Sequence, residues 1–128
     1  MRLLLDTCAF LWIVTGDSHL SPKASKLFRD QANEVFLSSV SAWEIAIKHS
    51  LGKLPLPRPP AVLVPDERQR HQILPLALDE TAALATAKLP DLHKDPFDRM
   101  LVCQAIMGGL TLLTPDPLVT QYPVATVW

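Results

Sequence analysis

Residues 2–6, with the sequence RLLLD, decide how the rest of the chain is interpreted. A run of leucines that ends in an acid is typical of a short strand buried on both faces. The next residues, TCAFLWIVTG, predict a helix that Gly16 ends. A buried strand that passes directly into a helix is the first half of a βαβ unit, and such units build parallel sheets.

The same apolar start is similar to a secretory signal, but Asp6 argues against one. A carboxylate inside the apolar region is costly to insert, and no small-residue cleavage site precedes the helix expected near Ser21. No stretch approaches the roughly 20 apolar residues that a membrane span requires. Cys8 and Cys103 lie in apolar surroundings without a CxxC spacing, so we expect two buried thiols in a cytoplasmic protein that is not bound to a membrane.

Length and charge limit the possible classes of protein. The 128 residues suffice for a continuous core, so we expect a single domain over residues 1–128. Twelve Lys and Arg residues against 13 Asp and Glu residues give a net charge of -1. This balance excludes a strong overall field that would attract nucleic acid or an anionic membrane, so RNA binding would depend on local basic residues.

Strand-like and helix-like segments alternate along the chain. Further strands are expected in residues 34–40, 73–78 and 110–114 and near the C-terminus. Helices are expected in residues 20–33, 41–54, 79–89 and 95–109, with a weaker one in 60–72 that contains Pro65. This order predicts an α/β fold with a mainly parallel central sheet and helices on both faces. In such folds ligands bind beyond the carboxyl ends of the strands.

Four acidic residues fall at that edge of the predicted sheet. Asp6 ends the first strand and Asp116 follows the strand 110–114, while Glu44 and Asp98 lie in the first turns of two helices. If they meet, each pair about 5 Å apart repels by about 3 kcal/mol at an effective dielectric of about 20. Either the acids lie apart or cations hold them together. Oxygen ligands alone would favour Mg²⁺ or Mn²⁺ over Zn²⁺.

Each acid also has a purely structural interpretation. Asp95 followed by Pro96 is a typical helix opening, and Ser41 with Glu44 has the spacing of a capping box. Asp6 would cap the helix that follows it, and Asp116 would open a turn between two prolines. Taken one at a time, the acids therefore leave structural and functional roles open.

Four stretches of sequence, taken together, are more specific. They are LLLDT near the N-terminus, SSVSAWEIAIKHSLGKL, DPFDRMLVCQA, and LTLLTPD with a closing VW. In this order and spacing they resemble PIN-domain ribonucleases of the VapC toxin type, over nearly the whole chain. The resemblance implies a PIN-like three-layer α/β sandwich. It also implies a Mg²⁺- or Mn²⁺-dependent endoribonuclease that cleaves RNA phosphodiester bonds as the toxin of a toxin–antitoxin pair.

The resemblance also assigns the site residues. It implies that the catalytic acids, and the ligands of one or two metal ions, are Asp6, Glu44, Asp98 and Asp116. Asp98 matches the third acid better than Asp95, because the family's acid is followed closely by an apolar helix that ends in alanine. Thr7 and Thr114 match small hydroxyl residues that accompany the acids. Pro115 departs from the pattern, since it removes a backbone N–H beside the fourth acid.

The family further implies three partners: an RNA such as tRNA or rRNA, a cognate VapB-type antitoxin, and a second copy of the chain in a homodimer. The basic residues near the acidic motifs, which we expect to contact phosphates, are Lys48, Lys53, Lys94 and Arg99. The histidines expected at the surface or in packing, without a metal site among them, are His49, His71 and His93. The tryptophans expected in the core are Trp12, Trp43 and Trp128.

Two other functions stay open. A non-catalytic PIN module would bind RNA or protein without cutting, although the intact acids argue against it. A receiver-like Mg²⁺-dependent signalling domain expects an acidic pair after its first strand and a lysine after its last, whereas LLLDT has one acid and LTLLTPD ends without lysine. A DxDxT phosphatase is disfavoured because Cys8 stands where its second aspartate is expected.

Overall fold

A computed structural model describes residues 1–128 and contains one five-stranded sheet in which every neighbouring pair of strands is parallel. The strands are β1 (Arg2–Leu5), β2 (Glu34–Ser38), β3 (Leu74–Leu76), β4 (Thr111–Leu113) and β5 (Thr126–Val127). Their order across the sheet is β3-β2-β1-β4-β5. The predicted mainly parallel α/β fold is confirmed, and the sheet is parallel throughout.

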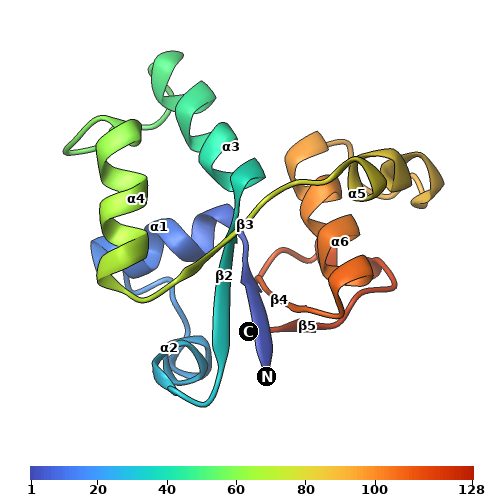
Figure 1. The fold of residues 1–128 in the computed structure, drawn as a ribbon, viewed down its shortest axis with the longest axis horizontal. Helices are drawn as coiled ribbons and strands as arrows, with labels where there is room; N and C mark the ends of the chain where they lie inside the picture. Colours follow the sequence, from blue (N-terminus) through green and yellow to red (C-terminus); the bar gives the residue numbers. More distant parts are fainter.

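Helices cover both faces of this sheet. They are α1 (Thr7–Thr15), α2 (Pro22–Arg29), α3 (Ser39–Ser50), α4 (Pro60–Arg70), α5 (Glu80–Ala85) and α6 (Pro96–Gly108), with 3₁₀ turns η1 (Thr86–Lys88) and η2 (Val119–Gln121). Helices α1, α2 and α4 lie on one side of the sheet, and α5 and α6 lie on the other (Figure 1). The molecule is therefore the three-layer sandwich that the sequence predicts. None of the helices is long and apolar enough to cross a membrane.

The strand β1 is buried on both faces, as its leucine run predicts. Leu3 and Leu5 are fully buried in one core cluster, which also contains Phe10 of α1. Leu4 points to the other face and packs in a second cluster with Leu101 of α6. Because successive side chains of a strand alternate, one run of leucines joins both cores, and each fully buried leucine stabilises the fold by about 1.5–3 kcal/mol.

The helix α1 begins directly at the end of β1. Asp6 is its N-cap, and one carboxylate oxygen accepts a hydrogen bond from the Ala9 backbone N–H at 2.6 Å. Gly16 ends the helix with a left-handed φ of 66°. Asp95 caps α6 in the same way, with the Phe97 N–H at 2.8 Å. The structural roles expected for Asp6 and Asp95 are both confirmed.

The start of α3 differs from the prediction. Its N-cap is Ser38, whose hydroxyl accepts a hydrogen bond from the Val40 N–H at 3.0 Å. The predicted capping box of Ser41 and Glu44 is therefore wrong, because the last residue of β2 already caps the helix. Glu44 consequently lies in the second turn of α3, where its side chain points into the protein and is 5% exposed.

Two expectations about burial are also wrong. Cys8 is exposed, because Ala9 and Phe10 occupy the core-facing side of α1, whereas Cys103 is buried as expected. Trp43 is 58% exposed on the outer side of α3 and contacts Phe97 edge to face, with ring centroids 5.1 Å apart. The other two tryptophans are half-buried, and their rings lie 5.7 Å apart (Trp12 and Trp128).

Candidate active site

The order in which the chain adds strands to the sheet reverses at β1. The chain adds β2 and β3 on one side of β1 and then returns to add β4 and β5 on the other side. In open parallel sheets such a reversal leaves a crevice beyond the carboxyl ends of the two strands that flank it. A receiver-like fold has the order 2-1-3-4-5, so the observed order argues against that alternative.

Two of the predicted acids lie at this crevice. Asp6 follows β1, and Asp116 lies in the segment after β4. The two strand ends are joined there, because the Asp6 N–H donates to the Leu113 carbonyl at 3.2 Å. Asp116 also opens a turn, as expected, since its Oδ1 accepts from the Leu118 N–H at 2.8 Å. Its other oxygen, Oδ2, faces the imidazole of His93.

Asp98 and Asp116 meet at a residue that the sequence did not single out. The Nε2 of His93 lies 2.9 Å from Oδ2 of Asp98 and 3.6 Å from Oδ2 of Asp116. One ligand atom from each of the three residues lies within 4.8 Å of the others. The expectation that His93 has only a surface or packing role is therefore wrong.

Glu44 is held between a hydroxyl and a lysine. The Thr7 hydroxyl donates to Oε1 of Glu44 at 2.7 Å, and the hydroxyl of Ser41 lies 3.0 Å from that of Thr7. Lys48, one turn later on α3, forms an ion pair with Oε2 of Glu44. The expectation that Thr7 holds a carboxylate is confirmed, and Ser41 joins the same network.

The charge of Asp6 is not compensated within the chain. The pKa of its carboxyl is raised to about 6, mainly by burial and to a smaller extent by the negative charges of Asp116 and Glu44. The hydroxyl of Thr114 and the Ala9 N–H donate hydrogen bonds that oppose this rise. The direction shows that desolvation and repulsion outweigh these bonds.

The carboxyl of Asp98 has a similar electrostatic environment. Burial raises its pKa to about 6, and the nearby charges of Asp95 and Glu44 add to the rise, which the hydrogen bond with His93 opposes. Electrostatic repulsion thus links all four predicted acids, whereas direct contact through a histidine joins only Asp98 and Asp116. The fold thus brings four acids, from two strand ends and two helices, to one edge of the sheet.

The thiol at this edge is not reactive. Cys8 is exposed as a residue, but its thiol is partly desolvated beside the acids. This desolvation, together with the negative charges of Asp6, Glu44 and Asp98, raises the pKa of the thiol to about 11. A thiol with such a pKa is protonated at neutral pH, so it is neither a nucleophile nor a thiolate ligand. The chemistry of the site therefore depends on carboxylates and on the imidazole.

The predicted basic contacts divide into two kinds. Arg99 donates to the carbonyl oxygens of Pro90 at 2.9 Å and Thr86 at 3.0 Å and to the hydroxyl of Tyr122 at 3.0 Å. Its guanidinium therefore holds the segment before α6, and its predicted contact with phosphates stays a prediction. Lys53 and Lys94 are exposed, and their contact with phosphates stays a prediction.

The donor set fits a hard divalent cation. Carboxylate oxygens with raised pKa values need positive charge, and oxygen ligands with one imidazole suit ions such as Mg²⁺ or Mn²⁺. No cysteine thiolate competes for the site. The residues present therefore agree with the metal that the sequence resemblance implies.

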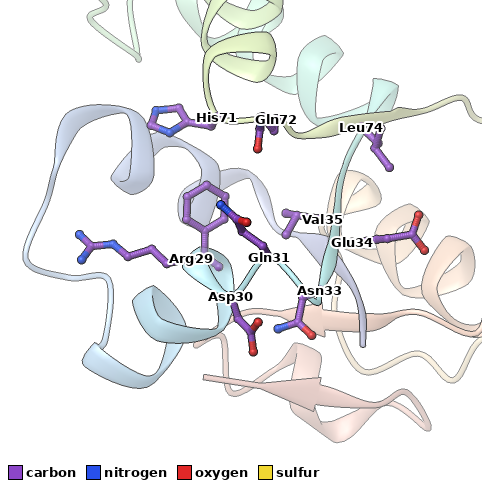
Figure 2. Close-up of a pocket in the computed structure, with 10 residues that line it drawn as sticks. Arg29, Asp30, Gln31, Asn33, Glu34, Val35, His71, Gln72 and Leu74 are labelled. Carbon is purple, nitrogen blue, oxygen red and sulfur yellow. The ribbon is translucent and has the colours of Figure 1, made fainter.

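A second polar region lies at the opposite end of the sheet. A cavity of about 520 Å³ is lined by residues of the α2–β2 loop, the start of β2 and the turn after α4 (Figure 2). Its polar side chains include Arg29, Asp30 and His71, and none of the four predicted acids lines it. This cavity is therefore distinct from the acidic crevice.

Comparison with known proteins agrees with this geometry. Residues 3–123 match the PIN domain family. Ribonuclease VapC16 of Mycobacterium tuberculosis (strain ATCC 25618 / H37Rv) is 49% identical over 53 residues. That match spans 41% of this chain and 38% of the relative, so it covers well under half of either protein.

Solved structures share the fold across the whole chain. VapBC2 from Rickettsia felis, bound to a promoter DNA fragment, has a TM-score of 0.74 at 14% identity and covers 100% of this chain and 99% of its own. DNA-bound VapBC from Salmonella typhimurium has a TM-score of 0.72 at 17% identity, with 99% and 97% covered. FitAcB from Neisseria gonorrhoeae has a TM-score of 0.56 at 21% identity, with 98% and 96% covered. The family match over residues 3–123, together with this shared fold, shows that the chain belongs to the PIN domain family.

Proposed function

We propose that the protein is a divalent-metal-dependent endoribonuclease of the VapC type and the toxin of a toxin–antitoxin pair. The observation that carries this proposal is the gathering of buried, mutually repelling acids where the sheet reverses, with the pKa values of Asp6 and Asp98 raised to about 6. Membership of the PIN family and the similarity to Ribonuclease VapC16 support it.

The metal would be Mg²⁺ or Mn²⁺. Asp6 and Asp98 would be its main ligands, and Glu44 and Asp116 would bind a second ion or orient water. When bound, the ion supplies positive charge that acidifies water and stabilises the negative charge that builds up on a phosphate during hydrolysis. The expected products are a 5′-phosphate and a 3′-hydroxyl.

The chain's own residues orient these carboxylates. Thr7 occupies Oε1 of Glu44 and Lys48 occupies Oε2, so this acid is fixed through both oxygens. Asp6 is held through the N–H of Ala9 and by the hydroxyl of Thr114. Carboxylates fixed by hydrogen bonds are pre-organised for charge that develops during the reaction, and this contributes to catalysis.

The proposal extends to partners and setting. A VapB-type antitoxin is supported by the structural similarity to VapBC complexes. An RNA such as tRNA or rRNA is the proposed substrate, with the exposed Lys53 and Lys94 as phosphate contacts. We further propose that residues 1–128 act as one PIN domain, as a homodimer, in the cytoplasm.

The test is cleavage of a pool of structured RNAs by the purified protein, with Mn²⁺ and with a chelator. We expect cleavage only with the metal, and a loss of more than about a hundredfold in Asp6→Asn and Asp98→Asn, since losing a ligand should exceed the effect of losing an outer partner. Asp91→Asn is the matched control, because Asp91 is exposed and lies in the loop before α6.

Three results would contradict the proposal. They are cleavage that persists in chelator, cleavage that survives in both ligand variants, or loss of cleavage in Asp91→Asn as large as in Asp98→Asn. Circular dichroism would show that each variant is folded. RNA binding without any cutting in Mn²⁺ would instead support the non-catalytic PIN module.

A further inference from the structure

His93 is the one side chain at the acidic crevice that carries a nitrogen able to bind a metal through a lone pair. It lies in the segment before α6, and its imidazole faces the acids with a side-chain exposure of 15%. We propose that Nε2 of His93 is a direct ligand of the divalent ion that Asp98 binds, and that Asp116 binds this same ion rather than a second one. The metal centre then prefers a first-row transition ion such as Mn²⁺ over Mg²⁺. This inference rests on the metal centre of the proposed function.

The distances fit one shared ion. An octahedral ion about 2.1 Å from each ligand has neighbouring ligand atoms about 3.0 Å apart. The Nε2 of His93 lies 2.9 Å and 3.6 Å from the facing oxygens of Asp98 and Asp116, and one ligand atom from each of the three residues lies within 4.8 Å of the others. Small side-chain movements would therefore let one ion contact both oxygens and the nitrogen.

The backbone around His93 is held by two side chains. The His93 N–H donates to the Tyr122 hydroxyl at 2.9 Å, and the His93 carbonyl accepts from Arg99 at 3.4 Å. Arg99 also donates to Tyr122 at 3.0 Å, and Tyr122 is 3% exposed. A buried tyrosine and an arginine therefore hold the backbone of the residue whose ring faces the two acids.

The nitrogen changes which ion the site favours. Mg²⁺ prefers oxygen ligands and keeps its waters, whereas imidazole is a better ligand for first-row transition ions. The competing interpretation is that His93 acts only as a positive substitute for the ion and moves away when metal binds. The two interpretations differ in one observable, which is a nitrogen in direct contact with the bound ion.

Pulsed electron paramagnetic resonance of Mn²⁺ bound to the full chain, without RNA, measures that contact. We expect ¹⁴N coupling in the wild type, a changed signal when the histidines are ¹⁵N-labelled, and loss of the signal in His93→Gln. His49→Gln is the matched control and should keep the signal, because His49 lies in the last turn of α3. By calorimetry, His93→Gln should weaken Mn²⁺ binding by at least about tenfold and Mg²⁺ binding less.

The outcomes separate this inference from the proposed nuclease. Bound Mn²⁺ without histidine coupling in the wild type, or coupling that survives in His93→Gln, overturns the ligand role of His93 and leaves the nuclease intact. No Mn²⁺ binding by the wild type overturns both. Mn²⁺ binding with histidine coupling but without any RNA cleavage supports the inference and refutes the nuclease. The isotope experiment needs no variant, so a folding defect in His93→Gln cannot hide the result.

Discussion

Two regions of this chain bury carboxylates, and they differ in how much positive charge lies close to them. Glu67 of α4 is 8% exposed, and its oxygens lie 3.2 Å from Arg58, 3.6 Å from Arg70 and 3.4 Å from His71. The acids beyond β1 and β4 have mainly one another as neighbours, with a single histidine and a single lysine in contact.

The difference indicates what each group is for. Burying an ionised carboxylate costs several kcal/mol unless opposite charge lies close by. At Glu67 the chain supplies that charge from Arg58 and Arg70, and the imidazole of His71 lies beside the other carboxylate oxygen. At the crevice it does not, and the pKa values of Asp6 and Asp98 rise to about 6 as a result. A buried acid that the chain leaves without compensation is a candidate for binding a cation.

The largest expected effect is the pH dependence of the metal-free protein. The pKa of Asp6 is about 6 in the folded state and 3.8 in the reference state, so between these values the folded state binds more protons. Stability is therefore highest below about pH 4 and falls as the pH rises from about 4 to about 6. The total fall for Asp6 is on the order of 2–3 kcal/mol, and about half of it takes place above pH 5. Asp98 acts in the same direction with a smaller effect, because it is more exposed.

Denaturation in chelator at about pH 5 and about pH 8 measures this fall. Asp6→Asn should remove most of the Asp6 contribution, because asparagine keeps the helix cap without the charge. Saturating Mn²⁺ should stabilise the wild type at about pH 8 and leave Asp6→Asn less affected. Equal pH slopes in wild type and variant would show that Asp6 is compensated within the chain, as Glu67 is.

Glu67→Gln tests the carboxylate that has basic side chains around it. The change removes the acid that three basic side chains surround, so it should lower the free energy of unfolding by about 1–2 kcal/mol. This is less than for a fully buried pair, because the side chains of Arg58 and Arg70 are 40% and 74% exposed. Mn²⁺ affinity and RNA cleavage should not change.

Denaturation and calorimetry measure these two quantities. The matched control is Glu34→Gln, since Glu34 is exposed and lies 3.9 Å from Arg2. It should change stability by less than about 0.5 kcal/mol. A loss of metal affinity in Glu67→Gln would mean that the two groups of acids are coupled and that the contrast between them is wrong.

The sequence predicted the position of the acids beyond β1 and β4 well. The leucine run and the alternation of elements predicted the parallel sheet, and Asp6 and Asp116 were placed correctly because they follow strands directly. Glu44 and Asp98 also lie near that edge, in the second turn of α3 and the first turn of α6. Only periodicity and local order were needed for these predictions.

Residues placed by long-range contacts could not be predicted in the same way. His93 reaches the crevice because Tyr122, which is 29 positions away, bonds to its backbone, and no local pattern encodes that contact. Arg99 takes its role from a similar contact with Tyr122 across the fold. The cap of α3 is Ser38 and not the predicted Ser41. The residue at which β2 ends decides which hydroxyl lies near the first free N–H groups of the helix.

Tyr122→Phe should have a smaller effect than either acid variant. The ring stays in the core, and the loss of its hydroxyl bonds to His93 and Arg99 should cost about 1 kcal/mol of stability. If these bonds position the imidazole, the ¹⁴N coupling to Mn²⁺ should also weaken. Thr120→Val is the control, since it removes an exposed hydroxyl bond to Pro117. Unchanged coupling with lowered stability would limit Tyr122 to a structural role.

The smallest expected effect is that of Lys48→Met. The lysine side chain is 43% exposed, whereas that of Glu44 is only 6% exposed and keeps its hydrogen bond from the Thr7 hydroxyl. Because solvent screens the lysine end of the pair, stability without metal should fall by about 1 kcal/mol or less. Removal of this positive charge makes the crevice more negative. Mn²⁺ should therefore bind more tightly, by up to about fivefold, or about 1 kcal/mol.

Calorimetry with Lys53→Met as the control measures this gain, because Lys53 is exposed and just beyond α3. Tighter Mn²⁺ binding in Lys48→Met, but not in Lys53→Met, would show that the Lys48 ammonium partly occupies the place of the cation. The negative charge of the acids would then be balanced even less by the chain in the variant than in the wild type. Weaker binding would show the opposite. Lys48 would then be needed to hold Glu44 in position, and the acidic crevice would share the internal compensation that characterises Glu67.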